Sequence, residues 1–170
     1  MSLYEASVPQ FKRILTNVDK WFDKLEAYAT SKKFDPAVLL TFRLAPDQLP
    51  LIKQIQIATD SAKLGVARLT GKQAPTHDDK ETTIAELRTR IASTIAFLDT
   101  LSPKDFEGAE TRKIPLPAFP GKLALGRDLL FEQALPNFYF HVTTTYAILR
   151  HNGVDLGKAD FLGTRTLQDA

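Results

Sequence analysis

Cysteine is absent from the 170 residues, and the chain has only three histidines, one tryptophan and one methionine. A disulfide framework, a thiolate nucleophile and a cysteine-ligated metal are therefore excluded, and stability must come from packing. The N-terminus has no basic segment followed by an apolar run, and no window approaches the roughly 18 uninterrupted apolar residues of a membrane span. We expect a cytoplasmic protein without a membrane partner.

An excess of one charge is also missing. The 22 basic and 20 acidic residues leave a formal net charge of +2, which is too balanced to indicate nucleic acid as a partner. The length and the hydrophobic content of 44% fit one globular domain over residues 1–170.

Several catalytic signatures do not occur. The chain has no Gly-x-Ser-x-Gly elbow, no Gly-x-Gly-x-x-Gly loop and no Glu-x-x-His motif, which argues against covalent hydrolases of that type, dinucleotide enzymes and di-iron bundles. The segment Gly65–Lys72 differs from a phosphate loop in its spacing and ends a predicted helix. No reaction is specified by motif.

Apolar residues do recur at three- and four-residue spacing, and this period predicts helices. The first is predicted over Ser7–Thr30 with Ser7 as its N-cap, and the second over Asp47–Thr70. The third is predicted to begin at a capping box, Thr83–Glu86, and to end before Ser102-Pro103.

The fourth helix contains the main ambiguity. It is predicted to start between Arg127 and Pro136, either kinked at Pro136 or newly begun there, and to end at Asn152-Gly153. Phe161 and Leu162 are expected to dock the tail onto the bundle.

The connections differ in composition. Lys33–Pro50 holds three prolines and an apolar run, which favours a packed crossover, and Gly71–Asp79 is interpreted as a surface loop. Glycine and proline exclude a long helix over residues 104–125, where alternating polar and apolar residues predict a short β-ribbon or an ordered loop. Together these features predict an all-α fold, a four-helix bundle with a long crossover loop.

A polar stripe on the last helix gives the candidate site. Asn137, His141 and Thr145 stand at i, i+4 and i+8 and share one face of an otherwise apolar helix. One interpretation is a core histidine held by polar neighbours, since buried polar groups are normally hydrogen-bonded. The other is a small-molecule pocket lined by these three residues and Gln56.

The other two histidines have no partner at helical spacing. His77 stands beside Asp78 and Asp79 and is interpreted as part of a solvated surface turn. His151 lies in the last helical turn, where a cation suits the helix dipole. Neither is expected to be catalytic.

Three segments carry a family resemblance: Arg43-Leu44-Ala45-Pro46-Asp47, Gln54-Ile55-Gln56-Ile57-Ala58 and Leu149-Arg150-His151-Asn152-Gly153. With the helix order, they resemble the DinB/YfiT-like bundle superfamily, and more closely a bacterial branch carried as a domain of unknown function. The resemblance implies a DinB-like four-helix bundle across nearly the whole chain.

The same resemblance implies where metal ligands would lie. Metal-binding members look to use one histidine of the second helix and a His-x-x-x-His pair of the fourth. His141 matches the last ligand, Asn137 stands at its partner, and Gln56, or alternatively Gln54, is near the second-helix position. Amides ligate zinc and nickel poorly, so the resemblance implies a degenerate metal site. We expect no cofactor, with a divalent metal such as Zn or Ni at His141 as the alternative.

Two functional hypotheses follow. The aromatic residues of the last helix spread around more than one of its faces, which suggests that some of them contact a second subunit. They are Phe131, Phe138, Tyr139, Phe140 and Tyr146. The first hypothesis is a non-enzymatic homodimeric or partner/ligand-binding module, whose contact surface is the last helix and the 104–125 ribbon. The alternative is a small-molecule-binding or metal-dependent transferase or hydrolase that uses a pocket around His141.

Overall fold

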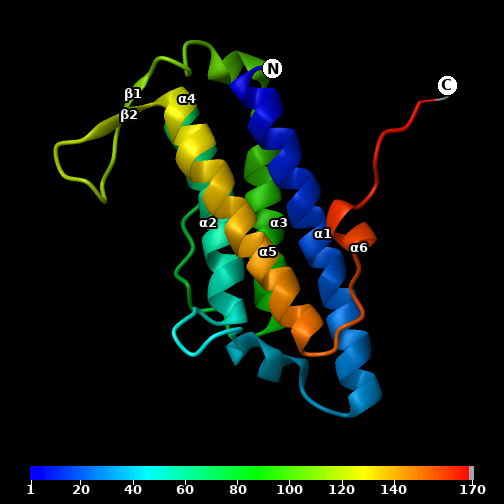
Figure 1. The fold of residues 1–170 in the computed structure, drawn as a ribbon. Coiled ribbons are helices and arrows are strands. Elements are labelled where there is room, and N and C mark those ends of the chain that lie inside the picture. The colour runs from blue at the N-terminus through cyan, green and yellow to red at the C-terminus, as the bar shows by residue number, and fades with distance from the viewer. Residues whose placement is uncertain (169–170) are drawn as a thin grey trace.

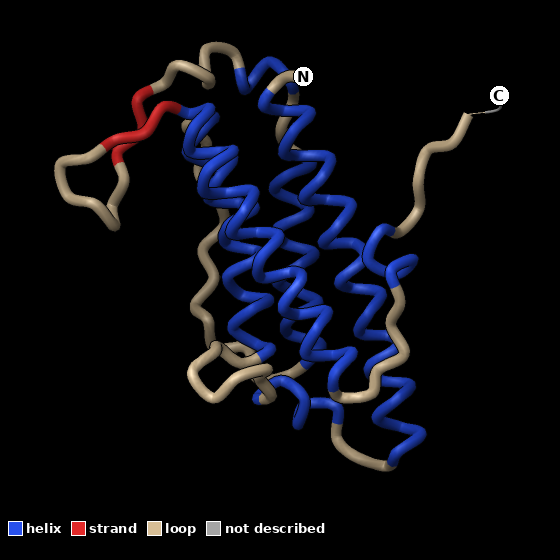
Figure 2. The backbone as a smooth tube through the Cα atoms, viewed as in Figure 1, coloured by secondary structure: helices blue, strands red, loops and turns tan. Residues whose placement is uncertain are grey.

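Four long helices pack side by side in the computed structural model, which describes residues 1–168 (Figures 1 and 2). They are α1 (Leu3–Lys32), α2 (Leu51–Thr70), α3 (Ile84–Asp99) and α5 (Leu135–His151). The short helices are η1 (Pro36–Thr41), η2 (Pro103–Phe106), α4 (Gly126–Asp128) and α6 (Lys158–Leu162), and the two strands are β1 (Lys113–Pro115) and β2 (Leu123–Leu125). The predicted all-α bundle with a crossover loop and a short ribbon is confirmed.

The predicted apolar stripes form one core. Its largest fully buried apolar side chains include Trp21, Phe11, Phe22 and Phe138. The rings of Phe11 in α1 and Phe138 in α5 meet edge to face at 4.7 Å, a favoured aromatic geometry. Each such side chain contributes about 1.5–3 kcal/mol by leaving water, so burial of these stripes holds the helices together.

The first helix starts earlier than predicted. Ser2 is its N-cap, and Ser2 and Glu5 form a capping box in which the Ser2 N–H donates to Glu5 Oε2 at 2.8 Å. Ser7 is therefore not the N-cap; it is buried, and its hydroxyl donates to the Leu3 carbonyl. The burial of Leu3 and Ala6 extends the helix beyond the start that Pro9 suggested.

The second helix starts later than predicted, and the third starts where predicted. α2 begins at Leu51, not Asp47, because Pro50 occupies the extended N-cap position. The predicted capping box of α3 is confirmed, since Thr83 accepts from the Glu86 N–H and the Glu86 side chain accepts from the Thr83 N–H.

α2 and α3 run in the same direction (Figure 1). A chain that joins two parallel helices must travel back along their length, and residues 71–83 do this as an extended segment without helix or strand. We call this segment the strap. It lies against the α2–α3 side of the bundle, opposite the α2–α5 contact.

The last helix is continuous from Gly126 to His151 but contains a π-helical turn, η3 (Leu129–Ala134). In this turn the Leu135 N–H bonds to the Leu130 carbonyl, five residues back. Pro136 offers no N–H to the preceding turn, and the π turn absorbs that defect without ending the helix. The helix therefore neither restarts nor ends at Pro136.

The tail docks as predicted. The Trp21 indole N–H donates to the Asp160 carbonyl at 3.1 Å, and the Phe161 ring stacks on Trp21 with centroids 5.7 Å apart. The Asn17 amide donates to the Phe161 carbonyl at 3.0 Å. These contacts fix α6 against α1.

Candidate functional site

The polar stripe of α5 faces α2, but its three members have different partners. Asn137 is exposed and its Nδ2 donates to Ser61 Oγ at 2.7 Å. His141 is 7% exposed, and its Nδ1 lies 2.7 Å from Gln54 Oε1. The Thr145 hydroxyl donates to the His141 backbone carbonyl at 2.8 Å, so it is used within its own helix and is not directed at a ligand.

Gln56 does not join this group. Its Nε2 donates to Glu81 Oε2 in the strap at 2.8 Å. Side chains two residues apart on a helix face nearly opposite directions, so Gln54 and Gln56 cannot both face α5. The expectation that Gln56 lies beside His141 is wrong, and Gln54 takes that place.

Hydrogen bonding fixes the orientation of the His141 ring. Gln54 Nε2 donates to the Leu49 carbonyl at 2.8 Å, which leaves Gln54 Oε1 to face the imidazole. A carbonyl oxygen only accepts, so His141 Nδ1 carries the proton and Nε2 is left as an acceptor. Burial lowers the pKa of His141, which favours this neutral form at pH 7.

Asn137 is oriented by the same logic. The Ser61 hydroxyl spends its only proton on the Ile57 carbonyl at 2.7 Å, so Ser61 Oγ accepts from the Asn137 amide nitrogen. Asn137 Oδ1 is then left as an acceptor. Asn137 Oδ1 and His141 Nε2 therefore stand one turn apart on α5 as two acceptors that no donor within residues 1–168 occupies.

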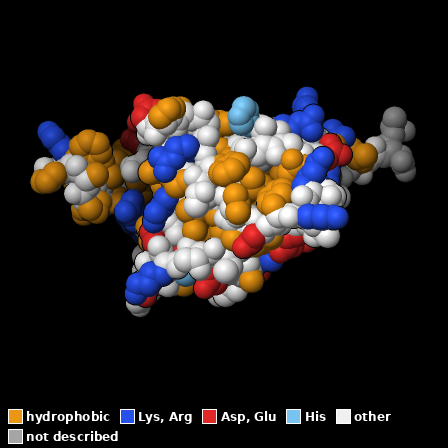
Figure 3. Space-filling view, turned by 90° about the horizontal axis from the view of Figure 1, so that it is seen from below, with side chains coloured by type: hydrophobic (Ala, Val, Ile, Leu, Met, Phe, Trp, Pro, Cys, Tyr) orange, Lys and Arg blue, Asp and Glu red, His pale blue; other side chains and the backbone are white. Residues whose placement is uncertain are grey.

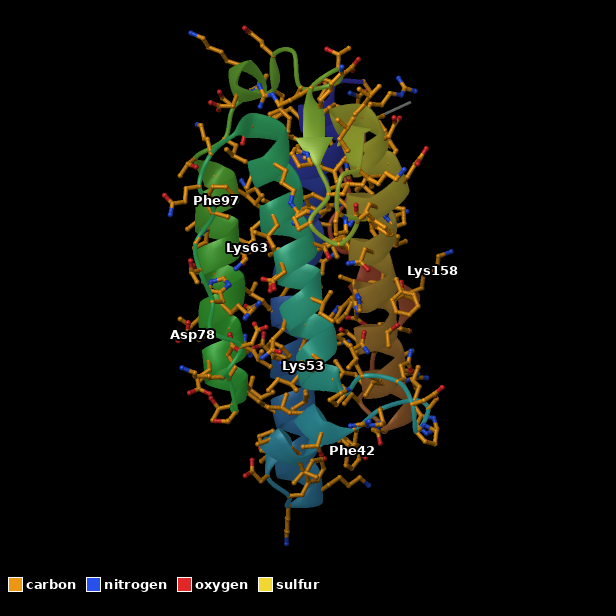
Figure 4. The ribbon with its side chains drawn as sticks, turned by 90° about the vertical axis from the view of Figure 1, so that its left-hand side faces the viewer. Phe42, Lys53, Lys63, Asp78, Phe97 and Lys158 are labelled. Atoms are coloured by element: carbon orange, nitrogen blue, oxygen red, sulfur yellow. The ribbon has the colours of Figure 1, made fainter. Side chains whose placement is uncertain are left out.

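A hollow of about 170 Å³ lies between α2 and the last helix, next to Asn137. Its polar lining includes Ser61, Arg68 and Gln133, and Leu64 and Leu129 supply apolar lining. Near it the helices approach closely: a Cβ on Gly65 would lie 2.9 Å from Ala134 Cβ. Figure 4 looks onto this side of the molecule.

On its opposite side, α2 contacts a buried arginine of α3, Arg90. The Arg90 side chain is 1% exposed and its guanidinium donates to both α2 and the strap. Its partners are Thr59 Oγ1 at 2.7 Å, the Gln56 carbonyl at 3.1 Å, Asp60 at 2.7 Å, Asp79 at 2.6 Å and Glu81 at 2.9 Å. A buried charge is tolerated only when it is paired in this way.

Lys63 makes a second tie to the strap (Figure 4). Its side chain is 4% exposed, pairs with Asp60 at 3.1 Å and donates to the Pro75 carbonyl at 2.9 Å. Its ammonium also lies 2.8 Å from His77 Nδ1. Because an ammonium only donates, Nδ1 accepts, and His77 Nε2 carries the proton toward Ser93 Oγ at 3.2 Å.

His77 is therefore not part of a solvated turn, as the sequence suggested; it is half-buried between α2 and α3. Burial, followed by repulsion from Lys63 and Arg90, lowers its pKa. For Glu81, burial acts to raise the pKa, but hydrogen bonds from Arg90 and Gln56 help to lower it overall. These groups hold one another, but beside them Gln56 Oε1 is buried and has no hydrogen-bond partner within residues 1–168.

Sequence reasoning missed this network, although a signal was present. Arg90 and Lys63 fall on the apolar stripes of their helices, where a charge has to be paired. Asp60 lies on α2 within reach of Lys63, but Asp79 and Glu81 lie in a segment without periodicity, so their pairing with Arg90 could not be deduced.

Comparison with known proteins places the chain in a family. A family model described as "Domain of unknown function (DUF1993)" matches residues 3–162. The chain belongs to the DUF1993 family. The crystal structure of a DinB family member protein from Shewanella denitrificans is 52% identical, covers 99% of this chain and 96% of its own, and superposes with a TM-score of 0.96. No curated protein matches. The DinB-like assignment made from the sequence is confirmed.

In this DUF1993 protein, the residues at the position where the sequence resemblance implied metal ligands do not fit a transition metal. His141 is an imidazole, but its neighbours Gln54 and Asn137 are amides, which are poor ligands for zinc or nickel. Within residues 1–168 no group of three or more histidine, aspartate or glutamate side chains is placed to hold a metal ion.

None of the helices in the described part of this DUF1993 chain is long and apolar enough to cross a membrane.

Proposed function

We propose that this protein is a non-enzymatic binding module that works as a homodimer, with the last helix as the centre of its contact surface. The observation that carries the proposal is Phe140, a large aromatic side chain on α5 that is 56% exposed. Large exposed apolar side chains that gather on one side of a protein are typical of interaction sites.

The aromatic residues of the last helix divide into two groups. Phe138 is fully buried, and Tyr139 and Tyr146 are half-buried in the core. Phe131 and Phe140 are 43% and 56% exposed. The core therefore uses only part of the aromatic set, and the remainder is available to a partner.

Other exposed apolar side chains lie on α2 and on the loop that precedes it. Leu64 on α2, which is 39% exposed, lines the hollow. Leu49 is 46% exposed, and its carbonyl holds Gln54 beside His141. In Figure 4 the crossover loop passes the lower end of α2 and α5, and the ribbon stands over their upper end. This side thus offers apolar area along its length.

The polar groups of this side support binding better than catalysis. Asn137 and His141 are neutral acceptors, and burial lowers the pKa of His141, which makes its imidazole a weaker base than a free one. Their arrangement fits hydrogen bonds from a partner.

The test is Phe140→Glu, measured by sedimentation velocity over a range of concentrations. We expect the wild-type protein to dimerise and the variant to be monomeric with unchanged helical content. Leu167→Glu is the control, because Leu167 is 79% exposed in the tail, away from the proposed surface. A wild-type protein that stays monomeric would contradict the proposal, as would a dimer that tolerates Phe140→Glu.

A second candidate function is small-molecule binding at His141 and Asn137. It is favoured by the fixed directions of their hydrogen bonds, which leave two acceptors one turn apart. Such a pair suits a molecule with N–H or O–H donors, for example a primary amine or an amide.

This candidate is tested by ¹⁵N NMR of the His141 ring during titration with a panel of small amines and amides. Binding should shift the Nε2 resonance, and His141→Phe should abolish binding while Thr145→Val preserves it. No shift with any member of the panel would count against this candidate. Stoichiometric zinc or nickel that is lost on His141→Ala would instead favour a metal site.

A further inference from the structure

The hollow between α2 and the last helix has both apolar walls and charged groups. Leu64 and Leu129 line it together with Asp60, Arg68 and Asn137. Its volume of about 170 Å³ is below the roughly 300–1,000 Å³ of sites for drug-sized ligands. A ligand of the hollow therefore has few heavy atoms.

The charged lining distinguishes the hollow from other apolar surface of the molecule. Figure 3 shows the lower end of the bundle, where apolar side chains gather near the centre of the face and charged side chains lie around them. In the hollow, a carboxylate and a guanidinium line the same space as the apolar residues. Apolar walls with a few polar groups among them are typical of sites that hold a small ligand in one orientation.

Arg68 supplies the positive end of the hollow. Its side chain is half-buried, yet it makes no ion pair and no side-chain hydrogen bond within residues 1–168. Arg90, by contrast, binds three carboxylates. Arg68 lies in the last turn of α2, and helical side chains lean toward the N-terminus of their helix. Its guanidinium therefore reaches back along the hollow with its donors free for an anion.

Asn137 and Asp60 supply acceptors at the other end of the hollow. Ser61 holds the Asn137 amide nitrogen, which leaves Asn137 Oδ1 without a donor within residues 1–168. Asp60 binds Lys63 and Arg90 through Oδ1, and a carboxylate has about four acceptor sites, so it can accept from a further donor. Seven residues, or about 10 Å of helix, separate Ser61 from the positive end on α2, and the arginine side chain there covers part of that length.

We infer that the hollow binds a small amino acid, whose carboxylate pairs with Arg68 and whose ammonium group donates to Asn137 Oδ1 and the Asp60 carboxylate. A guanidinium matches a carboxylate with two parallel hydrogen bonds. An ammonium group has three donors and no acceptor, so the reverse orientation would place like charges together. The walls formed by Leu64 and Leu129 fit a short aliphatic side chain.

The test titrates L-alanine into the ¹⁵N-labelled protein and follows the Arg68 Nε–H and the Asn137 side-chain amide by NMR. We expect saturable shifts of both signals. Acetate offers only the carboxylate and methylamine only the ammonium group, so each should bind at least about tenfold more weakly than L-alanine. The absence of any shift with L-alanine would overturn the inference. So would acetate that binds as tightly as L-alanine, because the hollow would then be a site for anions alone.

Variants test the two ends of the hollow separately. Arg68→Met and Asn137→Ala should each weaken L-alanine binding, the first at least about tenfold because a charge-assisted pair is lost. Asp60 is left unchanged because it also holds Arg90. Arg150→Met is the matched control, since Arg150 also lies in the last turn of a long helix but is 56% exposed and outside the hollow. Equal affinities of Arg68→Met and the wild type would contradict the site.

The results also separate this inference from the two functions proposed above. It does not depend on the homodimer, so L-alanine should bind whether the wild-type protein is monomeric or dimeric. It shares Asn137 with the second candidate but not His141, so His141→Phe should leave L-alanine binding unchanged. Binding that is lost in His141→Phe and kept in Arg68→Met would place the ligand at His141 and overturn the inference.

Discussion

The two sides of α2 are held to their neighbours by different interactions: paired charges on one side and close packing on the other. On the strap side, the segment 71–83 has no large apolar residue, and two buried cations, Arg90 and Lys63, hold it through named hydrogen bonds. On the α5 side, the two helices approach so closely that Gly65 contacts Ala134. Close packing holds α2 to α5 there. A segment that cannot bury apolar surface has to be fixed by paired charges.

This difference indicates which side of α2 still has groups that are free to contact a partner. The strap side is rich in charged groups, and its two buried cations, Arg90 and Lys63, are already paired with carboxylates. The α5 side has fewer polar groups, yet Asn137 and His141 keep free acceptors and Phe140 keeps its exposure. The side with less charge is the better candidate for function.

Arg90→Met tests the strap side and should have the largest effect. Removal of the guanidinium leaves Asp60, Asp79 and Glu81 without their shared cation, and we expect a loss of about 3 kcal/mol in the free energy of unfolding. Urea unfolding followed by circular dichroism measures this loss.

Arg88→Met is a matched control on the same helix. Arg88 also contacts three carboxylates, Asp19, Asp23 and Glu26, but its side chain is 26% exposed against 1% for Arg90. We expect a cost of no more than about 1 kcal/mol. Equal losses in the two variants would show that the strap network is no stronger than a surface cluster.

The pH dependence of stability gives a smaller effect that both sides share. His77 and His141 have native pKa values below the ordinary 6.5, so the folded state binds fewer protons than the unfolded state. Their contribution to stability is fully present above pH 6.5 and is lost as the pH falls through the lowered values. Unfolding free energies between pH 7.5 and about 5.5 should therefore decrease.

The two histidines can be told apart by salt. Burial is the largest cause of the lowered pKa of His77; Lys63 and Arg90 lower it further, while Asp60 and Glu81 oppose them. For His141 burial is the one cause of the lowered pKa. The part of the slope that His77→Gln removes should shrink at high ionic strength, and the part that His141→Gln removes should not. If neither variant changes the slope of the unfolding free energy against pH, the protons bound on unfolding are taken up by other groups.

Much of the fold could be predicted from the sequence because apolar period and capping chemistry are local. The Thr83–Glu86 box and the proline-rich ribbon follow from neighbouring residues alone. The start of α1 did not, because burial of Leu3 decides it and burial is a tertiary property. The choice between Gln54 and Gln56 depends on the rotation of α2 about its axis, which one sequence leaves open.

The strap has a consequence for how the chain tolerates change in length. α3 has 16 residues and so spans about 24 Å, whereas residues 71–83 could reach about 43 Å if fully extended. Evolution or an engineer could therefore delete a few residues without making the parallel connection impossible. Such a deletion would first draw Asp79 and Glu81 away from Arg90. The ion pairs with Arg90 therefore limit the length of the strap more tightly than the need to connect two parallel helices does.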